Sequence, residues 1–252
     1  MKIEFKDLLK DKNIKTNYDE IPLIYEDNHI LVVIKPAGIP SQKDKNNDIS
    51  MIEIIKRYIK ITKNKPGDVY LGLIHRLDTP TTGLMVLAKT SKAAERLSAN
   101  MRKGNFSKKY LAILKGNILN LKGFKNKNKF EINTEYNLIN YLRKDGKLNK
   151  SFVCRKEDKN AKKAELNFKV LKVNNSKNLS LVDVELITGR HHQIRAQFTH
   201  MGFPVYHDSK YDKKYNDNIL RLIAYNLEFD HPTLKNKMQF NVFEEAMKFL
   251  EF

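Results

Sequence analysis

The chain has 252 residues, of which 41% are hydrophobic, enough to bury the core of one large domain. It carries 47 lysine and arginine residues against 29 aspartate and glutamate residues, and this formal net charge of +18 favours association with polyanions such as nucleic acids. The longest apolar runs, residues 21–25 and 30–34, fall far short of the roughly 20 residues that a membrane-spanning helix needs, which excludes a spanning helix.

Lysine accounts for 38 of the 47 basic residues, a bias that genome composition explains as well as function does. The same bias makes the nine arginines informative, because an arginine kept amid so much lysine points to a need for its planar, forked geometry. The first twenty residues carry charges throughout and have no apolar signal core, so a cytoplasmic protein is expected.

The first predicted elements are a hairpin and a helix. Residues 21–26 and 29–35 are rich in isoleucine and valine and flank Asp27-Asn28, a pair typical of a tight turn. Ser50 and Glu53 match a capping box, and isoleucines recur after them at helical spacing, which predicts a helix over about 50–61.

Two short apolar segments, residues 70–74 and 84–88, flank a polar stretch with proline and glycine at 75–83. This pattern predicts two strands joined by a loop, and such loops present charged groups to solvent or substrate. Thr90 can cap a helix that continues through Met101, and residues 109–114 return to a strand pattern.

From about 117 to 165 the periodic signal fades, which predicts mobile surface without regular elements. Residues 143–163 hold nine basic against three acidic side chains, and two interpretations stay open: a basic finger that grips RNA, or a solvated loop. Residues 168–173 and 179–187 indicate another hairpin, and 189–201 a turn that enters a short helix. The alternation of elements favours an α/β or α+β protein with a single catalytic domain.

The loop residues His75-Arg76-Leu77-Asp78 and the following Thr82-Gly83-Leu84 resemble the signature of the RluA-type family of RNA pseudouridine synthases. Residues 24–38 resemble the opening strand pair and Lys-Pro-x-Gly turn of that family. Residues 108–112 resemble its second motif, 189–195 its third and 224–229 its closing strand, all in the expected order. The resemblance covers roughly residues 21–242.

The resemblance implies an α+β fold, the pseudouridine-synthase core, with a bent, mixed and mostly antiparallel sheet flanked by helices and loops. It also implies an isomerase that converts uridine to pseudouridine in RNA. Asp78 resembles the catalytic carboxylate, and attack on the sugar and proton abstraction both stay open as its role. Arg195 resembles the guanidinium that keeps this carboxylate ionised, although a surface position is the alternative. Tyr110 resembles the tyrosine that packs against the target uracil.

Enzymes that act on a stacked base must flip it out of the helix, and Arg76 resembles an arginine that takes the place of the flipped base. An ordinary ion pair with a carboxylate is the alternative for Arg76. Arg190 and Ile194, in the third motif, are further candidates for substrate contact, and Arg190 is equally suited to backbone positioning. His191 occupies a position where the family often has threonine.

No metal or other cofactor is expected, because the histidines lack the spacing of metal ligands. Residues 1–20 are expected to form an N-terminal extension and 21–252 the catalytic domain, without the small ribosomal-protein-like RNA-binding domain of many family members. Ribosomal RNA is the favoured substrate, transfer RNA the other candidate, and a monomer the default. The rival hypothesis, an RNA-binding protein without activity, is disfavoured by the presence of Asp78, Tyr110 and Arg195.

Overall fold

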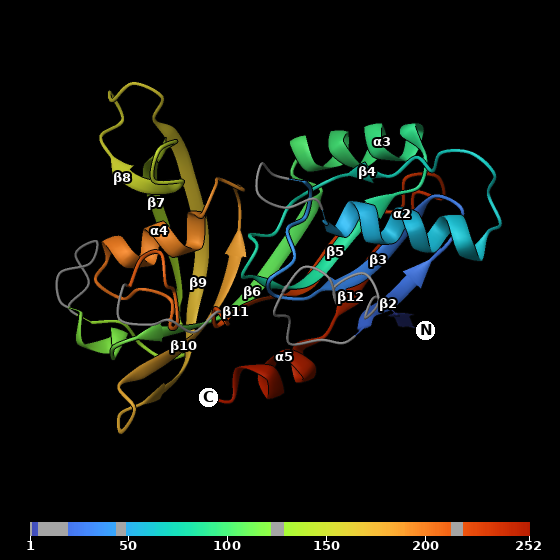
Figure 1. Cartoon of the computed structure of the whole chain (residues 1–252). Helices are drawn as coiled ribbons and strands as arrows, with labels where there is room; N and C mark the ends of the chain where they lie inside the picture. The colour runs from blue at the N-terminus through green and yellow to red at the C-terminus, as the bar shows by residue number, and fades with distance from the viewer. Residues whose placement is uncertain (1, 5–19, 44–48, 122–128, 213–218) are drawn as a thin grey trace. The chain divides into compact units, whose positions relative to one another are not determined.

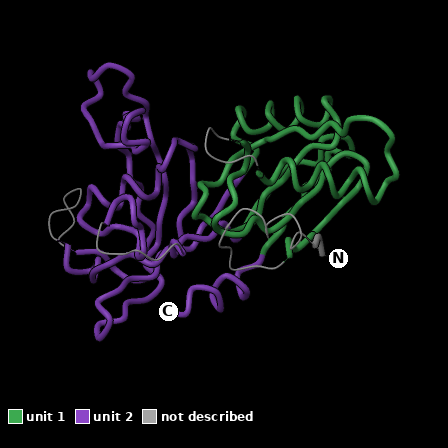
Figure 2. The backbone as a smooth tube through the Cα atoms, viewed as in Figure 1, with its two compact units in different colours: residues 1–106, 226–241 green, residues 107–225, 242–252 purple. Residues whose placement is uncertain are grey.

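The computed structural model describes residues 2–4, 20–43, 49–121, 129–212 and 219–252. The chain divides into two compact units, shown in Figure 2: unit 1 comprises residues 1–106 and 226–241, and unit 2 comprises residues 107–225 and 242–252. Most of the expected N-terminal extension lies outside the described residues. Within those ranges no helix is long and apolar enough to cross a membrane.

The described residues of unit 1 form antiparallel strands and two helices (Figure 1). Strand pairing runs β1-β2-β3-β5, with β4 beside β5 and β12 beside β11. The strands are β1 (Lys2–Glu4), β2 (Glu20–Glu26), β3 (Ile30–Lys35), β4 (Gly72–Leu73), β5 (Thr82–Ala88), β11 (Leu222–Asp230, in unit 1 from Asn226) and β12 (Lys237–Asn241). The helices are α2 (Met51–Thr62) and α3 (Ser91–Arg102).

Local polar chemistry defines the ends of these elements. Asp27 Oδ1 accepts hydrogen bonds from the backbone amides of His29 and Ile30, at 2.6 and 2.7 Å, which closes the β2–β3 turn. Ser50 caps α2 by accepting from the Glu53 amide, and Thr90 caps α3 in the same way. The predicted hairpin and both predicted helices are therefore confirmed.

The core of unit 1 forms where α2 packs on the sheet. Leu31 and Val33 of β3 and Met85 and Leu87 of β5 alternate along their strands, so they project from one face. The α2 side chains in this cluster are Met51, Ile54, Ile55, Tyr58 and Ile59. This packing anchors β3 and β5, which bound the part of the chain that contains the turn after β3 and the candidate catalytic loop.

Unit 2 is an antiparallel sheet in the order β6-β10-β9-β7-β8 (Figure 1). Its strands are β6 (Phe106–Lys115, in unit 2 from Ser107), β7 (Glu135–Asp145), β8 (Lys150–Cys154), β9 (Lys162–Asn174) and β10 (Leu179–Leu186). Its helices are the 3-10 turn η2 (Ile118–Asn120), α4 (Gln193–His200) and α5 (Phe243–Leu250). Helix α4 packs against the sheet through Phe198, whose ring lies edge-on to Phe168 of β9 at 5.3 Å. The predicted α+β class is confirmed.

The expectation of mobile surface without regular elements over 117–165 is wrong, because β7, β8 and the start of β9 lie within it. Tyr136, Leu138 and Leu142 of β7 are buried, but asparagines lie among them and charged residues occupy both ends of the strand. This alternation is weak in the sequence, and the ladder to β9 supplies the missing stability. The basic segment 143–163 is consequently the β7–β8 hairpin, the connection to β9 and its first residues.

Candidate active site

The first candidate residues lie in unit 1, in the loop between β4 and β5. Arg76 is exposed and Asp78 is partly exposed, whereas Leu77 between them is buried. A backbone hydrogen bond from the Thr81 amide to the Asp78 carbonyl, 3.0 Å long, closes a turn around the carboxylate. A loop is therefore present where 75–83 was predicted, but it ends at residue 81 because β5 begins at Thr82.

The end of β3 and the turn after it hold the backbone of this loop through hydrogen bonds. Ser41 Oγ donates to the Leu77 carbonyl at 2.8 Å and accepts from the Leu77 amide at 3.1 Å. The Gly38 amide donates to the Thr79 carbonyl at 2.9 Å, and Lys35 Nζ donates to the same carbonyl at 3.1 Å. The backbone is thus fixed on both sides of Asp78, which reduces the conformational freedom of its carboxylate.

Lys35 is the most deeply buried charged group near the loop. Its ammonium also donates to the carbonyls of Pro36 and Ile39, at 2.8 and 2.7 Å. Burial lowers the pKa of Lys35 to about 7, while the negative charge of Asp78 acts in the opposite direction. Three carbonyl acceptors engage three N–H donors, a number that only the protonated amine supplies.

His75 has a structural role. Its Nε2 accepts a hydrogen bond from the Val86 amide at 3.2 Å, and its ring lies edge-on to Phe106 at 5.6 Å. The imidazole is buried, so it joins the start of the loop to β5. It therefore helps to set where the loop leaves the sheet.

The other candidate residues lie in unit 2. Tyr110 is on β6, opposite Val184 of β10, and is 5% exposed. Ile194 and Arg195 lie in the first turn of α4 and are 4% and 2% exposed. The surface alternative for Arg195 is therefore wrong, because its guanidinium is buried.

Arg195 forms a two-pronged ion pair with Asp208. Its Nε donates to Asp208 Oδ2 at 2.7 Å and its Nη2 donates to Oδ1 at 2.8 Å. This fork-to-fork geometry makes the bonds short and directional. Sequence reasoning missed Asp208. A buried arginine needs a carboxylate partner, and Asp208 and Asp212 are the first two acidic residues after α4, which is the signal that could have found it.

Arg190 is exposed and contributes to the turn before α4. Its Nε donates to the Lys163 carbonyl at 2.8 Å, and its amide donates to Gln193 Oε1 at 2.9 Å. Gln193 Oε1 also accepts from Thr188 Oγ1, and its Nε2 donates to the Glu165 carbonyl. The structure thus gives Arg190 a backbone contact, and it identifies Gln193 as the organiser of this turn, which the sequence did not reveal.

The paired histidines of the third motif serve as structural links. Their rings stack at 3.9 Å, and His192 adopts the left-handed conformation, φ 52°, at the start of α4. His191 Nδ1 lies 3.0 Å from Ser151 Oγ, and His192 Nδ1 lies 3.2 Å from Tyr211 Oη. Across the described parts of the chain, no group of three or more His, Cys, Asp or Glu side chains is arranged to hold a metal ion.

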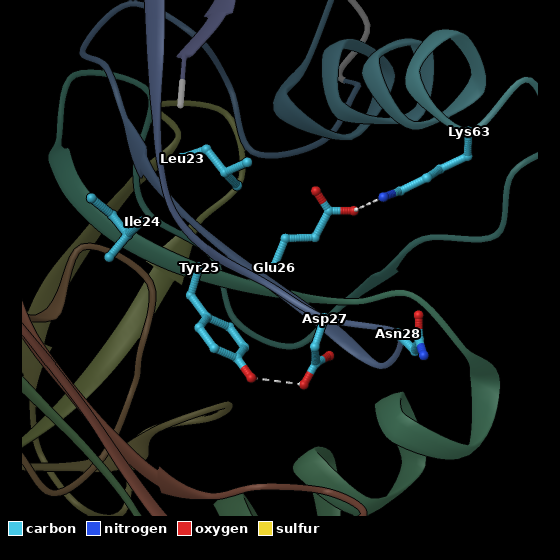
Figure 3. A pocket seen from close by; sticks show the side chains of 7 residues that line it. All are labelled: Leu23, Ile24, Tyr25, Glu26, Asp27, Asn28 and Lys63. Carbon is cyan, nitrogen blue, oxygen red and sulfur yellow. Dashed lines mark hydrogen bonds and ion pairs between the residues drawn. The ribbon is translucent and has the colours of Figure 1, made fainter.

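A polar hollow lies at the end of β2 in unit 1 (Figure 3). Its lining residues are Leu23, Ile24, Tyr25, Glu26, Asp27, Asn28 and Lys63. Tyr25 Oη donates to Asp27 at 3.0 Å, and Glu26 pairs with Lys63 at 3.7 Å and with Lys89 at 2.6 Å (Figure 3 shows the first two). Backbone amides, together with the His231 and Tyr25 side chains, lower the pKa of Asp27 despite the opposing effect of burial. Because the carboxylates of Glu26 and Asp27 are both engaged in these contacts, we assign the residues of the hollow a structural role in stabilising the β2–β3 hairpin.

Comparison with known proteins decides the family. The family model described as RNA pseudouridylate synthase matches residues 29–200, a stretch that contains Asp78, Tyr110 and Arg195. The chain belongs to the RNA pseudouridylate synthase family. The resemblance to the RluA-type synthases that the motifs indicate is thereby confirmed.

Relatives within the RNA pseudouridylate synthase family extend over most of the chain. An RNA pseudouridine synthase of Aquifex aeolicus is 31% identical over 250 residues, which cover 94% of this chain and 72% of that protein. The ribosomal large subunit pseudouridine synthase C of Buchnera aphidicola is 30% identical over 225 residues, which cover 86% of this chain and 64% of that protein. The chain thus spans a little less than two thirds of the length of the latter synthase.

The fold is also that of the RNA pseudouridylate synthase family. The structure of human RNA pseudouridylate synthase domain containing 4 matches with a TM-score of 0.67 at 20% identity, covering 91% of this chain and 93% of that one. At this identity the match concerns the fold alone. It confirms the pseudouridine-synthase core expected from the motifs.

Proposed function

We propose that this protein isomerises uridine to pseudouridine in ribosomal RNA, with Asp78 as its catalytic carboxylate. The observation that carries the proposal is the placement of Asp78: a partly exposed aspartate in a family loop whose backbone is held on both sides by Ser41, Gly38 and Lys35. Such preorganisation is what a reaction at one fixed ribose requires. Family membership supplies the reaction type.

The proposed reaction is a true isomerisation. The bond between ribose C1′ and uracil N1 breaks, a bond between C1′ and C5 forms, the proton on C5 is lost and N1 gains a proton. Asp78 acts at the sugar, either by attack or by proton abstraction, and both routes need the ionised carboxylate. No metal or cofactor takes part in this scheme.

Arg195 and Tyr110 complete the proposed catalytic set. A buried guanidinium favours the ionised form of a carboxylate that must work in a water-poor site, and this is the role proposed for Arg195. Tyr110 packs against the target uracil. Both side chains are buried, which suits groups that act on a base removed from water.

Arg76, Ile194 and Arg190 are proposed to contact the substrate. Arg76 is exposed within the catalytic loop, as a side chain that replaces a flipped base must be. The exposed basic side chains of the β7–β8 hairpin, Arg143, Lys144 and Lys147 among them, are proposed to contact the phosphate backbone. Catalysis and RNA contact are both assigned to residues 21–252, with 1–20 as an extension.

Ribosomal RNA is proposed over transfer RNA because the relatives named for a substrate are ribosomal large subunit synthases. A monomer in the cytoplasm completes the proposal. The test maps pseudouridine in both RNAs from cells with and without the gene, adding back either the native protein or Asp78→Asn. Loss of ribosomal sites that only the native protein restores would support the proposal, while loss confined to transfer RNA would overturn the substrate assignment.

A further inference from the structure

The short turn after α4 contains a buried carboxylate whose direction its own backbone sets. Asp208 is 1% exposed. Its Oδ1 accepts from the amides of Lys210 and Tyr211, at 3.1 and 3.2 Å, and its carbonyl accepts from the amides of Tyr211 and Asp212. The carboxylate therefore cannot rotate freely, and it offers the Arg195 guanidinium a fixed pair of acceptors.

Tyr211 of the same turn lies against the guanidinium from another direction. The Arg195 Cζ atom is 5.3 Å from the centroid of the Tyr211 ring, within the range of a cation–π contact. The Tyr211 ring thus contacts the same guanidinium that Asp208 binds through Nε and Nη2. A lysine at position 195 could use neither feature fully, because it lacks the planar fork.

The hydroxyl of Tyr211 fixes its own ring. It accepts from the Ser151 amide at 2.8 Å and donates to the Ser151 carbonyl at 2.9 Å, so its single proton is used. His192 Nδ1, 3.2 Å away, must then donate to the hydroxyl oxygen. Tyr211 is therefore tied both to β8 and to the residue that begins α4.

We propose that Asp208 and Tyr211 are positioning residues for Arg195, which fix its guanidinium before RNA arrives. The inference rests on the catalytic role proposed above for Arg195. Asp208 sets the edge of the guanidinium and Tyr211 its face, while the bond from Tyr211 to Ser151 links this arrangement to the β7–β8 hairpin. A misplacement of about 1 Å in a catalytic group can cost about 100-fold in rate, so loosening Arg195 should lower turnover.

The decisive variant is Asp208→Asn. The asparagine keeps the shape of the side chain but replaces one acceptor oxygen by an NH2 donor. This donor faces an N–H donor of the guanidinium, so one of the two hydrogen bonds to Arg195 is lost. The matched control is Asp212→Asn in the same turn, because the Asp212 carboxylate pairs with Lys115 at 2.7 Å. Turnover and KM are measured on unmodified ribosomal RNA, with folding checked by circular dichroism.

For Asp208→Asn we expect kcat to fall by about 10- to 100-fold with KM within about twofold of the native value, and for Asp212→Asn we expect neither constant to change by more than about twofold. Equal effects of the two variants, or a change confined to KM, would overturn the inference. Failure of the native protein to isomerise any uridine would instead refute the proposed function, so the two failures are distinguishable.

A second pair of variants covers the case in which Asp208→Asn does not fold. Tyr211→Phe keeps the ring against the guanidinium and removes only the hydroxyl, whereas Tyr211→Leu removes the ring as well. We expect kcat to decrease in the order native, Tyr211→Phe, Tyr211→Leu. A leucine variant that turns over as fast as the native protein would refute the role of the ring.

Discussion

Replacing Lys35 by methionine is expected to change how the free energy of unfolding depends on pH. Burial lowers the pKa of this lysine from its ordinary value of 10.5 to about 7 in the folded protein. The unfolded chain therefore binds more protons than the folded chain between these two values. Stability contributed through Lys35 is lowest below pH 7, rises with pH across this interval and levels off above 10.5.

The size of the effect follows from the two pKa values. Each pKa unit corresponds to about 1.36 kcal/mol, and the folded protein already holds only half a proton on Lys35 at pH 7. Between pH 7 and pH 9 the free energy of unfolding of the native protein should therefore rise by about 2 kcal/mol relative to that of Lys35→Met. The hydrogen bonds to three carbonyls favour the protonated amine, so a smaller rise would place the pKa above 7.

The measurement is urea unfolding of both proteins at pH 7, 8 and 9, analysed by linear extrapolation. Methionine keeps the length of the buried stem and removes the titrating group. Lys60→Met, at an exposed position on α2, serves as the control and should track the native protein at every pH. The reasoning is refuted if the difference between the native protein and Lys35→Met stays constant or shrinks as the pH rises.

Two further predictions concern the loop and the hairpin. Ser41→Ala should lower the free energy of unfolding by about 2 to 4 kcal/mol, because it leaves the amide and carbonyl of Leu77 unsatisfied in a buried position; a loss below about 0.5 kcal/mol in urea unfolding would contradict this. The double change Lys144→Gln and Lys147→Gln should reduce the slope of log affinity for RNA against log salt by about 1.5, because two phosphate contacts are lost. An unchanged slope in filter binding at several salt concentrations would show that these lysines lie outside the RNA contact.

Local chemistry made part of the fold predictable. Ser50 and Thr90 cap helices through amides only three residues away, and Asp27 closes its turn through the next few amides, so the signals lie within short windows of sequence. The strands β7 and β8 escaped prediction because asparagines interrupt the apolar pattern of β7, charged residues occupy its ends, and β8 is only 5 residues long. Their stability comes from pairing with β9, which no short window reveals.

The candidate site was predictable only in its motifs. Asp78 and Arg195 stand out because each lies in a contiguous signature. Their supports do not: Ser41 reaches Leu77 across 36 positions of sequence, and Asp208 lies 13 residues after Arg195 without a motif of its own. Such partners become visible only when the chain is folded and buried polar groups are matched with one another.

The most direct test of the central claim is an activity measurement on purified protein. Native protein and Asp78→Asn are incubated with unmodified ribosomal RNA, and pseudouridine is quantified site by site. The account predicts pseudouridine at one or a few uridines with the native protein, and a rate at least about 100-fold lower with Asp78→Asn at undiminished RNA affinity. Native protein that binds RNA but forms no pseudouridine, or an Asp78→Asn variant with native turnover, would contradict it.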